Sequence, residues 1–409
     1  MNSERRPWYH QLHWQIAIGL GAGLLVGLVA GESAERLAPL GDIFLRLLRM
    51  IIVPLVVSSL VVGTTGIGDS AKVGRLGGKA AVYYLVSSGA AVLAGLIAVN
   101  LVRPGVGADV PLHEVPEKLG LSVDSFGDIL LRIIPQNPIR AMVEGDMLGV
   151  IFFSLLLGVF ANRLPAAQKQ TIVRGFTAFF ELMMRITDFV IRLAPIGVFA
   201  LMAKVVGTMG GDVFLPLLRY MATVLFSLGI HAFVVLPLAL RAITGLNPLR
   251  YAGAVSPALL TAFSSASSSA TLPLTMDCVE MRAGVPNEVS SFVLPLGATV
   301  NMDGTALYEC VAAMFIAQVY GIEISFTNQI LVFLTALLAS IGAAGIPMAG
   351  LVMITVVLRA VGLPMEGVGL ILAVDRILDM CRTSVNVWSD SVGCAVVAVW
   401  EGYRLDEPT

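Results

Sequence analysis

Charged residues are scarce in this chain of 409 residues. They make up 13% of it, against about 25% in soluble domains, whereas hydrophobic residues make up 57%. A chain this apolar cannot cover its surface with polar groups, so we expect most of that surface to face lipid. The net charge of −2, without a run of like charges, argues against a nucleic-acid partner.

Cysteine and histidine are also rare, with four of each. The cysteines form no C-x-x-C pair, so we expect small core residues rather than disulfides or metal ligands. The sequence has neither G-x-S-x-G nor H-E-x-x-H, which argues against an intramembrane hydrolase and against an enzyme in general. It also has no N-x-[ST] glycosylation sequon, which favours a bacterial or archaeal cell (inner) membrane.

Long apolar stretches fill the first 250 residues, at about 16–30, 37–67, 80–102, 127–162, 171–207 and 213–243. Several exceed the roughly 20 residues that cross a bilayer, so they must tilt, kink or project beyond it. If the N-terminus is cytoplasmic, most of the Lys and Arg residues fall in the cytoplasmic connections. We therefore expect a multi-pass protein with both termini in the cytoplasm.

Two later apolar stretches are interrupted midway by small and polar residues. The first is Ser256–Met276, with a serine-rich centre, and the second is Ile330–Leu358, broken at Ser340–Gly350. Arms of about ten residues are too short to span a bilayer, so each stretch predicts a re-entrant helical hairpin. The alternative is an ordinary helix whose small residues pack against neighbours.

Polar groups interrupt the apolar span Phe292–Gly321, namely Asn301, Asp303, Thr305 and Glu309. Gly304 favours a local break in the helix, which would free backbone carbonyl oxygens. Together with Asn and Asp oxygens, these carbonyls suit a hard cation such as Na+. The alternative is a polar pair that only bonds a neighbouring helix.

Five charged residues occur in the membrane-length segment Gly369–Trp400: Asp375, Arg376, Asp379, Arg382 and Asp390. Placing one charged side chain at the centre of the bilayer costs about 3 kcal/mol, so these residues must face protein or water rather than lipid. At about 100° per residue, most of them share one helix face with Asn386, and Thr383 flanks that face. Carboxylates, an amide and a planar guanidinium suit an acidic amino acid, although an internal salt-bridge network is the alternative.

Four segments in this order resemble the dicarboxylate/amino acid:cation symporters. They are SSASSSATLP (264–273), LPLGATVNMDGTALYE (294–309), SIGAAGIPMAG (340–350) and AVDRILDMCRTSVNVWSDSVG (373–393). That family includes excitatory amino acid transporters and prokaryotic glutamate and aspartate transporters. The order and spacing match throughout 253–402, and the first 250 residues resemble the family's six-helix scaffold more weakly.

The resemblance implies an all-α polytopic membrane protein that forms a homotrimer. Eight transmembrane helices and two re-entrant hairpins would form inverted repeats, with a transport domain that moves by an elevator motion. The implied division is 1–79 (scaffold helices 1–2), 80–126 (helix 3 and outer loop, transport side), 127–207 (scaffold helices 4–5), 208–252 (helix 6, transport side), 253–402 (transport core) and 403–409 (cytoplasmic tail).

The resemblance also implies a substrate site for L-aspartate or L-glutamate. Asp379 would bind the α-ammonium group, Arg382 the side-chain carboxylate, and Asn386 with Ser268 the α-carboxylate. The remaining implied substrate-binding residues are Ser267, Ser269, Thr305, Thr383, Ala344, Gly345, Ile346, Pro347 and Gly350.

Three sodium sites are implied in the same way. The first would use Gly297, Asn301, Asn386 and Asp390, and the second Tyr84, Ser87, Ser88, Asn301 and Asp303. The third would use backbone carbonyls near Thr299, Ser340, Ile341 and Ala343, with the Met302 sulfur nearby. Glu309 resembles the acidic residue of the proton-coupled members, so H+ coupling and K+ countertransport are further expectations.

Four positions depart from the family pattern. Ala266 and Met380 stand where some members have an arginine near the site, and Arg376 is the residue that could replace its charge. Cys381 and Trp388 bear on the size of the substrate pocket. Two alternatives remain open: an H+-driven carrier of dicarboxylates or neutral amino acids, and an anion channel.

Overall fold

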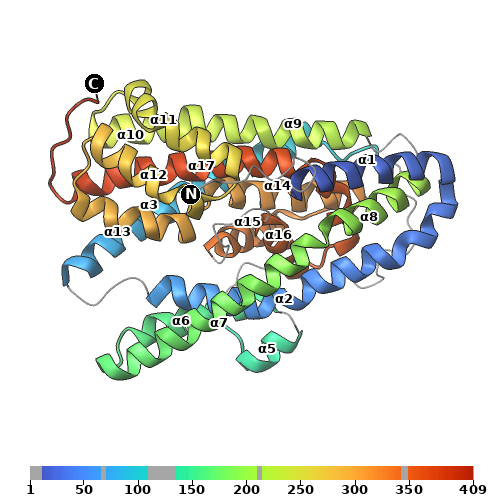
Figure 1. The fold of residues 1–409 in the computed structure, drawn as a ribbon, viewed down its shortest axis with the longest axis horizontal. Helices are drawn as coiled ribbons and strands as arrows, with labels where there is room; N and C mark the ends of the chain where they lie inside the picture. Colours follow the sequence, from blue (N-terminus) through green and yellow to red (C-terminus); the bar gives the residue numbers. More distant parts are fainter. Residues whose placement is uncertain are drawn as a thin grey trace, which may run out of the picture.

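The computed structural model describes residues 12–65, 71–108, 134–144, 146–209, 214–341 and 349–408. Within these ranges the chain is helical, with short connections and no strand. Figure 1 shows an elongated bundle in which α2, α5, α6 and α7 lie on one side and α9 to α14 and α17 on the other. The expected all-α class is therefore confirmed for the described residues.

The first half of the chain contains long helices that differ in part from the expected stretches. They are α1 (Leu12–Ala30), α2 (Ala38–Thr65), α3 (Ala71–Val102), α5 (Pro138–Glu144), α6 (Met147–Ala161), α7 (Ala166–Arg192) and α8 (Ala194–Met209). A 3-10 segment, Gly31–Leu37, joins α1 to α2. The stretch expected at 171–207 is two helices, because the chain breaks at Leu193 and Pro195 then suits the first turn of α8.

Small residues allow α1 and α8 to pack closely. Glycines recur every four residues along α1, and a methyl group at Gly19 or Gly23 would lie 2.4 Å from a carbonyl oxygen of α8. At Gly27 the corresponding distance to the carbonyl oxygen of Ala203 would be 2.9 Å. This is the small-residue pattern by which helices approach closely in membranes.

The second half begins with a helix that is locally widened. The helices α9 (Phe214–Ile230) and α10 (Leu236–Thr244) are continuous through one π-helical turn, His231–Val235. The first expected hairpin follows as α11 (Pro248–Ser265) and α12 (Ser268–Asp277). Its arms are unequal, 18 and 10 residues, so the expectation of two arms of about ten residues is wrong for α11.

The next span is interrupted as expected, but two residues earlier. It consists of α13 (Asn287–Val300) and α14 (Asp303–Val319), and the break falls at Asn301–Met302 while Gly304 is already helical. The second hairpin stretch gives α15 (Phe326–Ile341) and α16 (Ala349–Ala360), and its expected tip, 342–348, lies outside the described residues. The charged segment is one helix, α17 (Val368–Trp400).

Two apolar cores are joined by α17. One core gathers residues of α2, α3, α8, α9 and α14 to α16, together with Leu378 and Val385 of α17. The other gathers residues of α10 to α13 and the start of α3, together with Val392 and Val396 of α17. The polar face of α17 therefore runs through the interior of the bundle, where charge is stabilised only by specific partners.

Three helical segments among the described residues have the length and composition to cross a membrane: Ile18–Phe44, Arg75–Val102 and Leu215–Thr244. Shorter apolar helices include Val53–Thr65, Gly149–Ala161 and Phe326–Ile341. These helices fit a membrane protein, and the count of eight spans stays a prediction.

Candidate functional site

Arg382 lies inside the bundle and is 1% exposed. Its Nε and Nη2 atoms donate to Asp379 Oδ1 at 3.1 and 2.9 Å, and Nη1 donates to Asp375 Oδ1 at 3.1 Å. All three residues belong to α17, one or two turns apart, so the helical period itself brings them together. The charged face expected from the sequence is therefore present, and its arginine is paired with two carboxylates of the same helix.

Two neighbouring helices enclose the Arg382 guanidinium group. Its carbon lies 4.1 Å from the centroid of the Tyr308 ring on α14, which is a cation–π distance. On α16, a methyl group at Gly350 would lie 2.7 Å from the same carbon, so any larger residue there would require the guanidinium to shift. Arg376 adds a more distant cation, with its Nη1 3.7 Å from Asp379 Oδ2.

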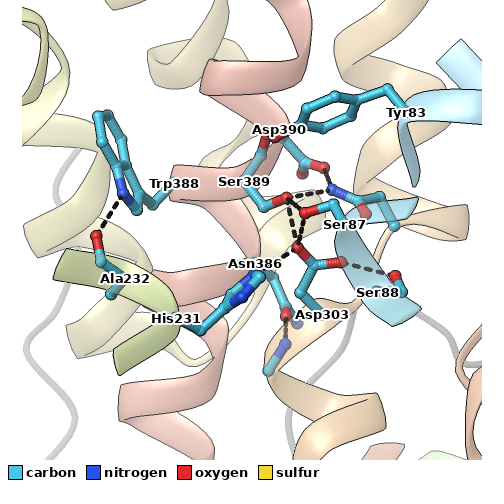
Figure 2. A network of polar contacts seen from close by, with 12 residues as sticks. Tyr83, Ser87, Ser88, His231, Ala232, Asp303, Asn386, Trp388, Ser389 and Asp390 are labelled. Atoms are coloured by element: carbon cyan, nitrogen blue, oxygen red, sulfur yellow. Dashed lines mark hydrogen bonds and ion pairs between the residues drawn. The ribbon is translucent and has the colours of Figure 1, made fainter. Parts of the chain in front are cut away.

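A second polar cluster surrounds Asp303 at the start of α14 (Figure 2). Its Oδ1 accepts from the Ser88 hydroxyl at 2.6 Å, and its Oδ2 accepts from the hydroxyls of Ser87 and Ser389, the latter at 2.6 Å. The Nε2 atom of His231 lies 2.8 Å from the same Oδ2. Residues from α3, the π-helical turn, α14 and α17 thus converge on one buried carboxylate.

Asn301 links this cluster to Asp390. Its amide nitrogen donates to Ser389 Oγ at 3.0 Å and to Asp390 Oδ1 at 2.8 Å. Its own oxygen is buried and has no hydrogen-bond partner among the described residues. A methyl group at Gly297 would lie 2.4 Å from Asp390 Oδ1 and 2.8 Å from the Tyr84 hydroxyl, so glycine allows this close approach.

The helix break at Asn301–Met302 gathers these oxygen atoms. The Gly304 amide beyond the break donates to Asn386 Oδ1 at 2.8 Å, and the Asn386 amide donates to Thr305 Oγ1 at 3.3 Å. Among the described residues no three His, Cys, Asp or Glu side chains form a metal cluster. The donor set of carboxylate, amide and hydroxyl oxygens is the kind that hard cations prefer.

The serine-rich tip of the first hairpin is a turn between α11 and α12. Ala266 has φ of 51°, in the left-handed region, and Ser267 caps α12 by accepting from the Ala270 amide at 3.2 Å. Ser268 is buried and Ser269 is exposed. Because α12 contacts α17, this tip belongs to the same half of the bundle as the charged face.

Four other expected site residues, Thr299, Met302, Ser340 and Thr383, form no side-chain hydrogen bond to either cluster within the described part of the chain. Thr299 is exposed, and its hydroxyl donates to the Leu296 carbonyl at 2.9 Å. Ser340 is buried in the last turn of α15, and Ile341, its last residue, is partly exposed. The side chains of Met302 and Thr383 are buried. Ala343, Ala344, Gly345, Ile346 and Pro347 lie outside the described residues.

Glu309 lies two turns into α14 and is fully buried. Neither of its carboxyl oxygens has a hydrogen-bond partner among the described residues. An ionised carboxylate in this position would be costly, because none of the described residues donates to it.

Three residues of these clusters were missing from the sequence prediction: His231, Tyr308 and Ser389. A feature of the sequence points to each of them. His231 interrupts an apolar span, Tyr308 follows Thr305 by about one helical turn, and Ser389 directly precedes Asp390. Trp388, by contrast, points away from Asp303 in Figure 2, and its indole donates to the Ala232 carbonyl at 3.0 Å.

A cavity of about 1080 Å³ lies behind the charged face of α17. It is lined by residues of α9, α10, α11 and the opposite side of α17, where Cys381 and Trp388 occur. Cys381 and Trp388 thus line this cavity, and their effect on the size of the substrate pocket stays a prediction.

The chain is similar in sequence to known proteins over nearly its whole length. Residues 12–400 match the Sodium:dicarboxylate symporter family. The chain is 36% identical to the proton/glutamate-aspartate symporter of Escherichia coli (strain K12), over 95% of this chain and 93% of that protein. It is 37% identical to the proton/sodium-glutamate symport protein of Bacillus caldotenax, over 97% and 96%.

A vertebrate relative matches at the same level. The chain is 36% identical to excitatory amino acid transporter 3 of Mus musculus, over 97% of this chain and 87% of that protein. The resemblance found in the four motifs is thus confirmed over nearly the whole length, and these relatives are transporters and not enzymes. The chain belongs to the sodium:dicarboxylate symporter family.

Proposed function

We propose that this protein is a secondary active symporter of acidic amino acids, L-aspartate or L-glutamate, driven by Na+. The observation that carries this proposal is the buried Arg382–Asp379 pair on α17, about two helical turns before Asp390, which joins the oxygen cluster of Asn301 and Asp303. The names of the relatives, which include glutamate, aspartate, sodium and proton, support the same activity.

Substrate binding would exchange the partners of one ion pair. The guanidinium of Arg382 would release Asp379 and donate two parallel hydrogen bonds to the side-chain carboxylate of the substrate. Asp379 would then accept from the α-ammonium group, so both buried charges remain paired throughout. Asn386 with Ser268 would bind the α-carboxylate, and Ser267, Ser269, Thr305, Thr383, Gly350 and residues 344–347 would complete the site.

Cations would be held by the neighbouring oxygen cluster. The Asn301 oxygen, which has no partner among the described residues, and the buried carboxylates of Asp303 and Asp390 would supply ligand oxygens. One proposed site uses Tyr84, Ser87, Ser88, Asn301 and Asp303, another uses Gly297, Asn301, Asn386 and Asp390, and a third uses carbonyls near Thr299, Ser340, Ile341 and Ala343. Asn386 belongs to both the substrate and cation sites, which would couple the two ligands thermodynamically.

The transport cycle would follow the family pattern. We propose that segment 253–402, with helices 3 and 6, moves as a transport domain against scaffold segments 1–79 and 127–207 in a homotrimer. The protein would span the cell membrane eight times with both termini in the cytoplasm. Glu309 would carry H+ with the substrate, and K+ would accompany the return of the empty carrier.

Uptake by purified protein in proteoliposomes tests this proposal. Radiolabelled L-aspartate should accumulate when Na+ is higher outside, and L-glutamate should compete while succinate and L-alanine compete weakly. Each of the Na+, H+ and K+ gradients is imposed alone. Accumulation driven by the H+ gradient without any Na+ requirement would support the H+-driven carrier instead, and anion current without accumulation would support a channel.

A further inference from the structure

His231 is a buried imidazole at the start of the π-helical turn between α9 and α10. Its Nε2 atom lies 2.8 Å from Asp303 Oδ2, as Figure 2 shows, and its Nδ1 atom has no partner among the described residues. A carboxylate only accepts hydrogen bonds, so Nε2 is the ring nitrogen that carries the proton. Isolated π-helical turns inside α-helices are frequent at functional sites, which draws attention to this residue.

The donors around Asp303 crowd one of its two oxygen atoms. His231, Ser87 and Ser389 all donate to Oδ2, which has only two lone pairs, whereas Oδ1 accepts from Ser88 alone. A cation that binds Oδ2 must therefore displace or redirect some of these donors. The four donors differ in whether they can turn from hydrogen-bond donor to cation ligand.

The hydroxyl groups can exchange roles, whereas the imidazole cannot. Rotation of a serine O–H bond turns the hydrogen away and presents an oxygen lone pair, so the hydroxyls of Ser87 and Ser88 can change from donors to cation ligands. The protonated Nε2 of His231 has no lone pair to offer. Its hydrogen bond to Oδ2 is thus the contact that persists when the serines turn toward a cation.

We propose that His231 is a positioning residue for the cation site, holding Asp303 through Nε2–H while the surrounding hydroxyls become ligands. It acts as outer partners do at metal sites, where a hydrogen bond fixes the orientation of a ligand. The inference deepens the proposed function, since it rests on a cation binding at Asp303. It assigns His231 to cation affinity and not to contact with the amino acid.

Two amide substitutions of His231 test whether a donor must stand at the place of Nε2 or whether any polar side chain is sufficient. The side-chain nitrogen of His231→Gln reaches approximately to the place of Nε2, whereas that of His231→Asn reaches only to the place of Nδ1. Ser227→Ala is the matched control, because Ser227 is buried one turn earlier on α9 and, among the described residues, its hydroxyl bonds only the Thr223 carbonyl of its own helix. All variants are purified as the full chain, and their folding is checked by elution volume and melting temperature without Na+.

Cation binding is read from the rise in melting temperature during a NaCl titration, with choline chloride holding ionic strength constant. His231→Asn should raise the half-saturating Na+ concentration by about tenfold or more, because a hydrogen bond to a charged group is lost. His231→Gln and Ser227→Ala should stay within about threefold of wild type. At saturating Na+, the aspartate concentration for half-maximal uptake should be similar in all four proteins.

Equal Na+ affinities in the Asn and Gln variants would overturn the positioning role, whether both match wild type or both are weakened. A His231→Asn variant that loses aspartate affinity at saturating Na+ but keeps its Na+ affinity would also overturn it. If His231→Asn does not fold, the Gln variant decides, since a tenfold loss of Na+ affinity there contradicts the proposal. Failure of wild type to respond to Na+ would instead refute the proposed function.

Discussion

A buried arginine is costly to desolvate, and three side chains stabilise Arg382. Two carboxylates accept from it, and an aromatic ring covers one face. The free energy of such an arrangement depends on every partner being present, because an isolated buried charge is far less stable than a paired one. This explains how the same side chain can be stable both when paired with Asp379 and, as proposed, when paired with a substrate carboxylate.

Arg382→Ala should therefore abolish binding of acidic substrates. Breaking a buried charge pair on one side costs about 3–5 kcal/mol, which corresponds to two to four decades in affinity. Competition of unlabelled aspartate, serine and alanine against uptake measures the effect, and the neutral amino acids should gain relative to aspartate. Arg376→Ala is the comparison, since the contact of Arg376 with Asp379 is longer, 3.7 Å, and partly exposed, so its loss should reduce affinity much less than the loss of Arg382. An Arg382→Ala protein that still binds aspartate within about threefold of wild type contradicts the assignment.

Glu309 is a carboxyl group that accepts no hydrogen bond from the part of the chain that the structure describes, which suits a residue that exchanges a proton during transport. Glu309→Gln mimics the permanently protonated form, so we expect it to keep substrate binding and homoexchange. Net uptake should lose its dependence on pH and on an outward K+ gradient. The measurement compares net uptake and exchange at several pH values, and unchanged pH and K+ responses in the variant would remove Glu309 from the coupling mechanism.

The helical period predicts one of the two clusters better than the other. Asp375, Asp379 and Arg382 follow one another on a single helix, so their proximity follows from about 100° of rotation per residue. His231 and Ser87 reach Asp303 from 72 and 216 residues away. Nothing local in the sequence specifies these contacts, and they depend on how the helices pack.

At the scale of elements, interruptions in apolar stretches were predicted more reliably than lengths. The serine-rich tip and the break near Asn301 are where the chain leaves helical geometry, because small and polar residues stabilise turns there. The length of α11 was underestimated, since its apolar and small residues continue the helix back to Pro248. The division of 171–207 at Leu193 was missed because hydrophobicity continues unbroken across it.

The packing of α1 on α8 gives a test at this scale. Gly23→Ala places a methyl group 2.4 Å from the Phe199 carbonyl oxygen, so the two helices must separate and the melting temperature should fall. Gly21→Ala on the same helix is the control, because a methyl group there meets nothing within 4 Å. Alanine favours helix over glycine by up to about 1 kcal/mol, so this variant should match or exceed wild type in stability. Equal melting temperatures for the two variants would show that close packing at Gly23 does not stabilise the protein.

At the scale of the whole molecule, distant parts of the chain are joined beyond the apolar cores. The start of α3 and the end of α17 meet through Glu401, which accepts from Arg75 Nη2 at 2.7 Å and lies 2.7 Å from Lys79 Nζ. The Lys79 ammonium also donates to the Trp400 carbonyl. These contacts connect residues more than 300 positions apart, so they stabilise the folded arrangement of helices and not a single helix.

This connection should make stability depend on pH in a defined direction. The hydrogen bond from Arg75, followed by that from Lys79, lowers the pKa of Glu401 to about 2. Its folded-state pKa is below the unfolded value of about 4.3, so the stabilisation is fully present above that value and is lost as pH falls toward 2. Glu401→Gln should thus lower the melting temperature at pH 7, and the difference from wild type should shrink below about pH 4.5. Glu144→Gln is the control, because Glu144 pairs with Arg140 within one exposed helical turn and should have little effect at any pH. A Glu401→Gln deficit that stays constant from pH 7 to the lowest pH at which the protein remains folded would show that the charge of Glu401 is not what stabilises the α3–α17 contact.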